Sequence, residues 1–230
     1  MKTIGLIGGT SWVSTVDYYN LINQLTNDQL GGVHAARLIL YSLNFGEIKA
    51  LLDENNWKRI TEIYIDVANK LKVAGADCIV LAANTPHLIA EKIQTSANLP
   101  LIHIAEATAK VISNSGVKKV ALLGTRFVME NSFYSDTLSL HGIETIVPDT
   151  HERAFIHNSI FTELTKGVFT KETKASYLSL INRLITQGAE GIVFACTEIP
   201  ILLKDTHFSV ITFDTTLIHA QATVAFATAH

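Results

Sequence analysis

The sequence predicts an α/β protein of two similar doubly wound lobes, each built on a parallel sheet and related by internal duplication. Short apolar segments alternate along the chain with segments whose apolar residues follow helical spacing. The apolar segments contain few polar residues, as is typical of parallel strands that are buried on both faces. Two kinds of segment then recur, in the same order, in the second half of the chain. Such recurrence indicates a repeated α/β unit.

The first half of the chain alternates strands and helices. Pro86 suits the first turn of a helix, because the N–H group that proline lacks has no partner within the helix at that position. We expect strands at Thr3–Gly8, Arg37–Leu43, Asp77–Ala82 and Leu99–Ile104, and helices at Thr15–Leu30, Asn55–Val73, Pro86–Ser96 and Glu106–Ser115.

The second half repeats two segments of the first. Lys118–Gly124 (KKVALLG) resembles Lys2–Gly8 (KTIGLIG), 116 residues earlier. Gly188–Glu198 (GAEGIVFACTE) resembles Gly75–Thr85 (GADCIVLAANT), 113 residues earlier, and each follows an amphipathic segment. The alternative is that all strands of parallel sheets look alike, but the shared order and the similar offsets favour duplication.

The repeat places the boundary between the lobes near Asn114–Val117. We expect a first lobe of residues 1–114 and 215–230, and a second lobe of residues 115–214. Ligands of open parallel sheets bind at the carboxyl ends of the strands. We therefore expect an active site in a cleft between the lobes, where Ala83–Thr85 and Cys196–Glu198 lie on either side of one ligand.

Composition excludes several classes of protein. The 230 residues carry a net charge of −3 with no basic run, so no nucleic-acid partner is expected. The chain shows no signal-peptide pattern and no apolar run near the roughly 20 residues that span a bilayer, so we expect cytoplasmic residence and no membrane association. Its two cysteines form neither a disulfide framework nor a CxxC motif, and no pair of histidines has metal-ligand spacing, so we expect no metal site.

Cys196 is the candidate catalytic thiol. It follows the strand that ends at Ala195 and precedes the helix or turn at Pro200. The positive end of a helix there is expected to lower the thiol pKa, and backbone N–H groups there can hold a carboxylate. A buried core cysteine is the alternative, but the equivalent repeat position also ends in polar residues. Cys78 lies near the start of its strand, roughly 16 Å from the strand end, and is expected to pack in the core.

Four motifs taken together resemble the aspartate/glutamate racemase family. They are Gly8–Trp12 (GGTSW), Ala83–His87 (ANTPH), Gly124–Arg126 (GTR) and Cys196–Glu198 (CTE). The resemblance runs from Ile4 to His219, and Lys2–Ser14 and Gly124–Met129 look especially like bacterial aspartate/glutamate racemases of broad specificity. It implies an enzyme that uses neither PLP nor another cofactor, acts on a small acidic amino acid and forms a homodimer.

In this family two opposed acid/base residues, usually cysteines, flank the Cα atom of the substrate. One removes the α-proton and the other delivers a proton to the opposite face. The resemblance assigns one of these roles to Cys196, whereas the other position is Ala83, which cannot exchange a proton. Three explanations remain open: a neighbour such as Thr85, Thr10 or a bound water supplies the second proton, the chemistry needs only one thiol, or Ala83 is an introduced change.

The resemblance also implies substrate-binding positions. Hydroxyl, amide and backbone donors for the α-carboxylate come from Asn84, Thr85, Thr125 and Thr197, and the loop after the first strand contributes Gly9, Thr10 and Ser11. This loop is not GxGxxG, so no dinucleotide is implied.

The remaining candidate site residues are charged residues and residues with weaker support. Lys166 matches the position of a partner for the side-chain carboxylate of the substrate, although a solvated lysine beside Gly167 is an equal alternative. Asn44 is a candidate for the cleft wall. Glu198 is a candidate either for proton relay or for a helix N-terminal charge. His87 is expected to be a packing residue, and Asp214 and His219 carry no assignment.

Three functions remain open from the sequence. The first is a racemase of aspartate or glutamate. The second is a single-cysteine decarboxylase or isomerase of the same superfamily, similar to the arylmalonate decarboxylases, in which one thiol protonates a carbanion. The third is an impaired protein that binds acidic amino acids without turnover.

Overall fold

The computed structural model describes residues 1–229 and divides into two compact lobes. The first lobe comprises Met1–His103 and the segment that begins at His219, and the second comprises Ile104–Ile218. The division therefore falls earlier than the expected 114/115 boundary and later than the expected 214/215 boundary. Helix α5 (Ile104–Ser115) belongs to the second lobe because its residue Thr108 accepts a buried hydrogen bond from Tyr134 Oη at 3.1 Å.

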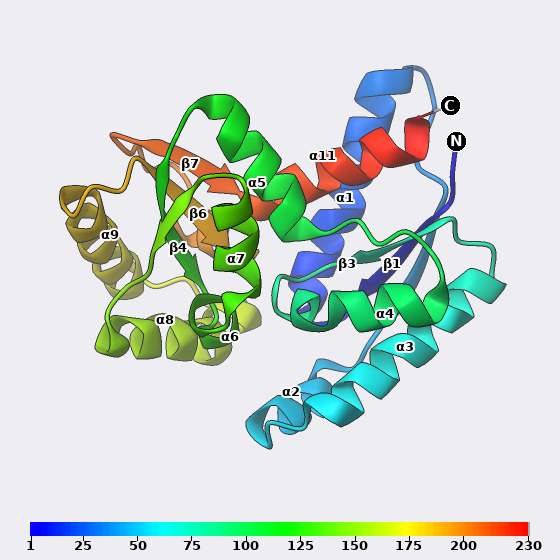
Figure 1. Ribbon diagram of the computed structural model, residues 1–230, viewed down its shortest axis with the longest axis horizontal. Coiled ribbons are helices and arrows are strands. Elements are labelled where there is room, and N and C mark those ends of the chain that lie inside the picture. The colour runs from blue at the N-terminus through cyan, green and yellow to red at the C-terminus, as the bar shows by residue number, and fades with distance from the viewer. Residues whose placement is uncertain (230) are drawn as a thin grey trace. The chain divides into compact units, whose positions relative to one another are not determined.

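The first lobe contains a three-stranded parallel sheet in the order β2-β1-β3 (Figure 1). Its strands are β1 (Ile4–Gly8), β2 (Leu38–Ser42) and β3 (Cys78–Leu81). The expected strand Leu99–Ile104 is reduced to an isolated bridge between Leu101 and Ile79. Pro100 lies beside the bridge and has no N–H group with which to extend a strand ladder.

The helices expected between Thr15 and Ser96 are present, with two differences. The segment expected as one helix from Pro86 is a 3-10 turn, η1, followed by α4, and an additional helix, α2, follows β2. Asn44 begins α2 by accepting a hydrogen bond from the Gly46 N–H group at 3.1 Å. The bounds are α1 (Trp12–Leu30), α2 (Phe45–Asp53), α3 (Trp57–Val73), η1 (Thr85–Ile89) and α4 (Ala90–Ala97).

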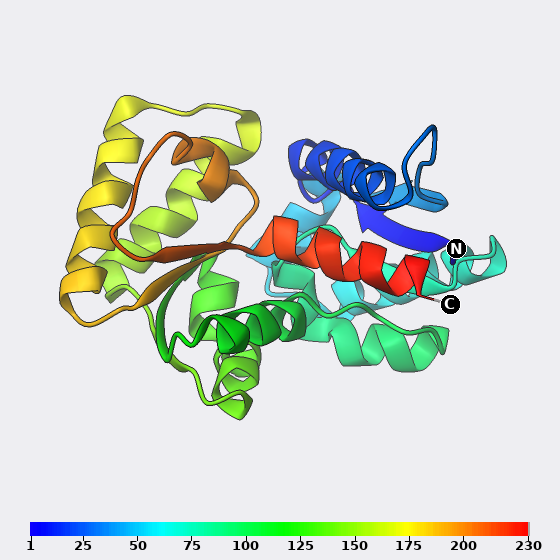
Figure 2. The same ribbon diagram turned by 90° about the horizontal axis from the view of Figure 1, so that it is seen from above.

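The C-terminal helix α11 (Thr215–Thr228) completes the core of the first lobe. Its residues Ala220 and Val224 pack in one cluster with Tyr18 of α1 and with Ile4 of β1. Figure 2 shows α11 beside α1, with the N-terminus and the last turn of α11 at one end of this lobe. Cys78 belongs to the same cluster, and burial raises the pKa of its thiol to about 11. The prediction that Cys78 packs in the core is therefore confirmed.

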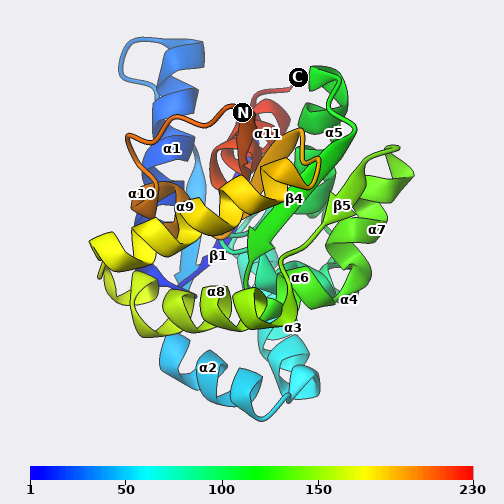
Figure 3. The ribbon, with the colours of Figure 1, turned by 90° about the vertical axis from the view of Figure 1, so that its left-hand side faces the viewer.

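The second lobe contains a four-stranded parallel sheet in the order β5-β4-β6-β7. Helices α8 and α9 pack on one face of this sheet, and α5 and α7 lie on the other (Figure 3). The strands are β4 (Lys119–Gly124), β5 (Glu144–Ile146), β6 (Gly191–Ala195) and β7 (Ile211–Asp214). The helices after α5 are α6 (Arg126–Glu130), α7 (Ser132–Leu140), α8 (Thr150–Thr162), η2 (Leu164–Lys166), α9 (Lys171–Thr186) and α10 (Glu198–Leu202).

The two sheets repeat one arrangement. Strand β1 pairs with β2 and β3, as β4 pairs with β5 and β6. Strands β1 and β4 form one of the two matching sequence pairs, and β3 and β6 form the other. The predicted α/β class with two parallel sheets is confirmed, and the common strand order is what duplication would produce. Within residues 1–229, no helix combines the length and the apolar character that crossing a membrane requires.

Gly9 is required by the close approach of two backbones. It has a φ of +90°, and a Cβ atom there would fall on the backbone of Leu43. We expect Gly9→Ala to lower the free energy of unfolding by about 3 kcal/mol or more. Gly142 has a φ of +71°, but no heavy atom lies within 4 Å of the position that a Cβ atom would take, so Gly142→Ala is the matched control, with a loss of about 1 kcal/mol. Urea denaturation measures both, and equal losses would contradict the role given to Leu43.

Candidate active site

The first lobe gathers the predicted site residues at one edge of its sheet. Because β1, β2 and β3 are parallel, their carboxyl ends meet at the same edge. The segments that follow these ends are Gly9–Ser11, Asn44 and Ala83–Thr85. The structure thus brings together, in one lobe, every first-lobe residue that the sequence assigned to the site.

The loop Gly9–Ser11 is held by side chains at the start of α1. Gly9 N–H donates to Thr15 Oγ1 at 2.8 Å, and that hydroxyl donates to the Ser11 carbonyl at 2.8 Å. Ser14 Oγ donates to the same carbonyl at 3.0 Å. The N–H group of Gly9 is therefore engaged within the loop, and a part for Gly9 in substrate binding stays a prediction.

Thr10 contacts α3 rather than the start of α1. Its side chain is hydrogen-bonded to Tyr64 of α3, a fully buried residue. Burial raises the pKa of Tyr64 to about 12, and the hydrogen bond to Thr10 opposes this rise. Tyr64 could not be identified from the sequence, because its position on the apolar face of α3 is also typical of a core residue.

The turn after β3 carries Ala83, which is half-buried, and Asn84, which is buried. His87 Nδ1 lies 2.9 Å from the Ala83 carbonyl oxygen and 3.3 Å from that of Asn84. Ser14 Oγ lies 3.4 Å from the Ala82 carbonyl oxygen, so it touches this turn as well as the Ser11 loop. Ser14 is a second residue that sequence reasoning missed.

The side chain of Asn44 caps helix α2. Its Oδ1 atom caps α2, and its Nδ2 group donates to Glu47 Oε1 at 3.0 Å. Both ends of the amide are thus engaged within the first turn of α2, and its position at the cleft wall stays a prediction.

The second lobe places Thr125 and Cys196 on neighbouring strands. Gly124 of β4 is in register with Ala195 of β6, so the next residues are Thr125 and Cys196. Thr125 is buried and begins α6. Asp214, at the end of β7, accepts hydrogen bonds from the N–H groups of Thr216 and Leu217 and thereby starts α11. Asp214 therefore has a structural role.

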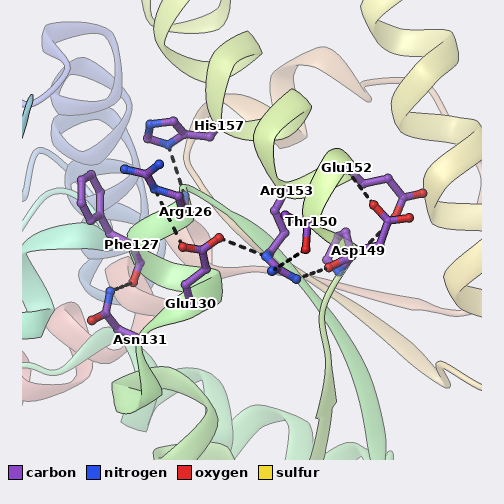
Figure 4. A network of polar contacts seen from close by, with 10 residues as sticks. Arg126, Phe127, Glu130, Asn131, Asp149, Thr150, Glu152, Arg153 and His157 are labelled. Carbon is purple, nitrogen blue, oxygen red and sulfur yellow. Dashed lines mark hydrogen bonds and ion pairs between the residues drawn. The ribbon is translucent and has the colours of Figure 1, made fainter.

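A polar network anchors the turn that presents Thr125 (Figure 4). Arg126 N–H donates to His157 Nδ1 of α8 at 3.2 Å. Glu130 accepts a hydrogen bond from Arg153 Nε at 3.1 Å and lies 3.8 Å from Arg126 Nε. These contacts join α6 to α8, so the backbone after β4 is fixed from outside the sheet.

Cys196 lies in a buried polar group with Thr197 and Glu198, just after β6. Its side chain is 7% exposed, and Sγ donates to Glu198 Oε2 at 3.1 Å. Thr197 Oγ1 donates to the same carboxylate oxygen at 2.6 Å. One buried carboxylate thus accepts from both the thiol and the neighbouring hydroxyl.

The pKa of Cys196 differs from the expectation drawn from the sequence. Burial, and next the negative charge of Glu198, raise the pKa of the thiol well above its usual value. The backbone N–H groups of Glu198 and Ile199 do lower it, as a helix N-terminus should, but their effect is smaller. The expected depression is therefore wrong, because desolvation of a thiolate outweighs two N–H donors.

Lys166 lies beside the helix that follows Cys196. It is exposed and ends η2, and Gly167 follows it with a φ of +74°. Leu164 of η2 packs in the same core cluster as Ile199 of α10. This packing brings the η2 turn to the Cys196 side of the second lobe, and the role of Lys166 in binding a substrate carboxylate stays a prediction.

Two parallel α/β lobes, with polar side chains and a thiol at their strand ends, define the architecture of the Asp/Glu racemases. The chain belongs to the Asp/Glu/Hydantoin racemase family, whose model matches residues 7–223. Membership confirms the resemblance read from the four motifs and makes the protein an enzyme of the PLP-independent amino-acid racemase class.

Individual relatives agree with this membership. The broad specificity amino-acid racemase RacX of Bacillus subtilis (strain 168) is 31% identical over 161 residues, which are 70% of this chain and 69% of RacX. The crystal structure of a candidate Asp/Glu racemase from Yersinia pestis is 45% identical, with a TM-score of 0.91 over 99% of each chain. An aspartate racemase homologue from Pyrococcus horikoshii OT3 is 35% identical, with a TM-score of 0.85 over 100% of each chain.

Proposed function

We propose that this protein moves the α-proton of a small acidic amino acid, aspartate or glutamate, with Cys196 as its acid/base thiol and without a cofactor. The observation that carries the proposal is the Sγ atom of Cys196 at the end of β6, hydrogen-bonded to the buried carboxylate of Glu198 at 3.1 Å. No other thiol among the described residues lies at the carboxyl end of a strand, since Cys78 lies at the amino end of β3 inside the core.

The Cys196 thiolate is the base in this proposal. It takes the α-proton, the electron pair of the C–H bond moves into the carboxylate to form an enediolate, and Sγ becomes a thiol. Return of a proton from Sγ restores the same enantiomer. Burial and Glu198 raise the pKa of this thiol, so the thiolate is a stronger base once formed, but a smaller fraction of it is present near neutral pH.

Donors and a cation stabilise the enediolate in this mechanism. We assign α-carboxylate contacts to Thr125 and Thr197 in the second lobe and to Asn84 and Thr85 in the first. Lys166 is the proposed partner of the side-chain carboxylate, which selects aspartate or glutamate over neutral amino acids. Fixed donors of this kind stabilise developing charge more than water does.

Position 83 makes the two faces of the substrate unequal. An alanine methyl group neither accepts nor delivers a proton, so inversion depends on a weaker group such as Thr10, Thr85 or water. We therefore expect exchange at one face to be faster than inversion.

The experiment is α-proton exchange in D2O with both enantiomers of aspartate and glutamate. The α-proton signal and the chiral composition are followed together. We expect one enantiomer to gain deuterium with its configuration retained, and inversion to follow more slowly. Absence of both exchange and inversion for all four substrates, at high enzyme concentration, would overturn the proposal.

Ala83 favours a second candidate function, a single-thiol decarboxylase. Loss of CO2 from a malonate generates the carbanion, and one thiol is enough to protonate it. A panel of malonates separates the candidates: CO2 release without amino-acid exchange would select the decarboxylase. A ligand that raises the melting temperature without either reaction would indicate a binder, with about 2.7 kcal/mol of stabilisation at 100 times its Kd.

Glu198 controls the pH dependence of exchange in this mechanism. Because the carboxylate raises the pKa of Cys196, exchange should rise with pH through the range in which the thiolate forms. Glu198→Gln removes the charge, so the rise should move to lower pH and exchange near neutral pH should increase. A lower pKa increases the fraction of Cys196 that is thiolate and makes that thiolate a weaker base. The first effect is larger below the pKa, because the rate constant of proton transfer changes by less than the acid dissociation constant of the thiol.

The matched control for this prediction is Glu190→Gln. Glu190 lies just before β6, at the opposite end of the strand, and accepts a hydrogen bond from the Lys118 N–H group at 2.7 Å. Its removal should leave the pH profile of exchange in place. A Glu198→Gln profile that stays in place or moves to higher pH is the contrary result.

We further propose that the enzyme is a homodimer, as its family resemblance implies, and that it acts in the cytoplasm. Analytical ultracentrifugation tests the first statement, since each chain has a mass of 25.2 kDa. A sedimenting species with the mass of one chain, across the working concentration range, would refute it.

A further inference from the structure

Three histidine rings pack together inside the first lobe. The centroid of His87 lies 4.9 Å from that of His103 and 5.3 Å from that of His219, and both pairs meet edge to face. Tyr18 of α1 contacts His219 edge-on at 5.6 Å. His87 is 2% exposed, and His219 is fully buried.

His87 and His219 are uncharged near neutral pH. Burial, followed by the nearby histidines, lowers the pKa of His87 well below its usual value, and burial lowers the pKa of His219 to about 4. A neutral imidazole carries one N–H group. Hydrogen bonding therefore decides which nitrogen holds it.

The carbonyl oxygens that contact His87 and His219 determine which ring nitrogen of each histidine carries the proton. Because a carbonyl oxygen only accepts, His87 carries its proton on Nδ1 and donates to Ala83 at 2.9 Å and to Asn84 at 3.3 Å. His219 likewise donates from Nε2 to the Ile102 carbonyl at 2.7 Å, and its Nδ1 accepts from Tyr18 Oη at 2.8 Å.

The hydrogen bonds of His87 fix two peptide planes in the turn after β3. In a trans peptide the N–H group points away from the C=O group of the same plane. The carbonyls of Ala83 and Asn84 point toward His87, so the N–H groups of Asn84 and Thr85 point away from it. The same bonds also fix the direction in which the side chain at position 83 leaves the backbone.

Two histidines of the cluster lie where the chain leaves the first lobe and where it returns to it. His103 is the last residue of the first segment of this lobe, and His219 is the first residue of the returning segment. Both rings pack on His87, so the ring that holds the turn is itself held by two distant parts of the chain.

We propose that His87 is a positioning residue, whose ring N–H group holds the backbone of Ala83 and Asn84 so that position 83 and the following amides meet the substrate in a fixed direction. This inference rests on the proposed function. It gives the His of the ANTPH motif a role in the reaction, beyond the packing role expected from the sequence.

The test compares His87→Asn with His87→Gln in the Ala83→Cys background, where a thiol restores proton transfer at position 83. An asparagine amide can place an N–H group near the position of Nδ1, whereas a glutamine amide reaches toward Nε2. We expect His87→Gln to lower the ratio of inversion to same-face exchange at least fivefold, and His87→Asn to restore most of it. A purely structural defect lowers both rates together and leaves the ratio unchanged, which would overturn the proposal.

A second measurement needs no turnover. In the otherwise unaltered chain, backbone amide NMR signals of Asn84 and Thr85 should shift strongly in His87→Gln and weakly in His87→Asn. Unmoved amides in the glutamine variant would overturn the proposal. If the amides shift as expected but Ala83→Cys produces no inversion, the positioning role stands and the proposed racemisation fails.

Discussion

Cys196→Ala should abolish α-proton exchange, with a loss on the order of 10²–10⁴-fold or down to the background rate. The thiol is the group that takes and returns the proton in the proposed mechanism, and the carboxylate of Glu198 lies behind it at 3.1 Å. Exchange of the α-proton of aspartate and glutamate in D2O, followed by NMR, measures the loss.

The matched control is Cys78→Ala, the other free cysteine of the chain. Cys78 packs in the core of the first lobe and is fully buried. Its replacement should reduce the free energy of unfolding by about 1 kcal/mol while exchange per folded molecule is retained. If Cys196→Ala retained exchange, or if both variants lost it equally, Cys196 would not be the acid/base residue.

Ala83→Cys should increase inversion of the substrate at least a hundredfold, because it supplies a second acid/base group at the opposite face. Position 83 is half-buried at the carboxyl end of β3, so a sulfur atom there extends the side chain without entering the packed core. The ratio of inversion to exchange, measured by chiral analysis and NMR, reports the second proton transfer directly.

Ala82→Cys provides the control for this gain. Ala82 is 1% exposed and belongs to the hydrophobic core, and successive side chains near a strand end point to opposite faces. A thiol at position 82 should therefore add no inversion. Unchanged inversion in Ala83→Cys, with Cys196-dependent exchange intact, would show that position 83 does not face the Cα atom from which Cys196 removes the proton.

Several features of the fold could be predicted because their cause is local. Continuous apolar runs identified β1, β3, β4 and β6, and helical spacing identified α3 and α5. The repeat identified equivalent strands in the two lobes. Two elements were predicted wrongly. Helix α2, which begins at the cap formed by Asn44, was not expected, and the strand expected at Leu99–Ile104 is reduced to a single bridge beside Pro100.

The sequence also located the candidate residues at strand ends, since parallel strands direct their carboxyl ends to one edge. It could not find Tyr64 or Ser14, because each looks like an ordinary helix residue until its hydroxyl group meets Thr10 or the Ser11 carbonyl. Nor could it assign a tautomer to His87, which depends on the carbonyl oxygens that surround the ring.

The sequence by itself determined the α/β class, the repeated unit and the thiol that ends β6, because periodicity and motif spacing act over short stretches of chain. Tertiary structure decided that α5 joins the second lobe, that Cys196 has a raised pKa, and that His87, His103 and His219 share one cluster. Each of these depends on burial or on contacts between residues far apart in the chain, and desolvation exists only once those segments have packed together.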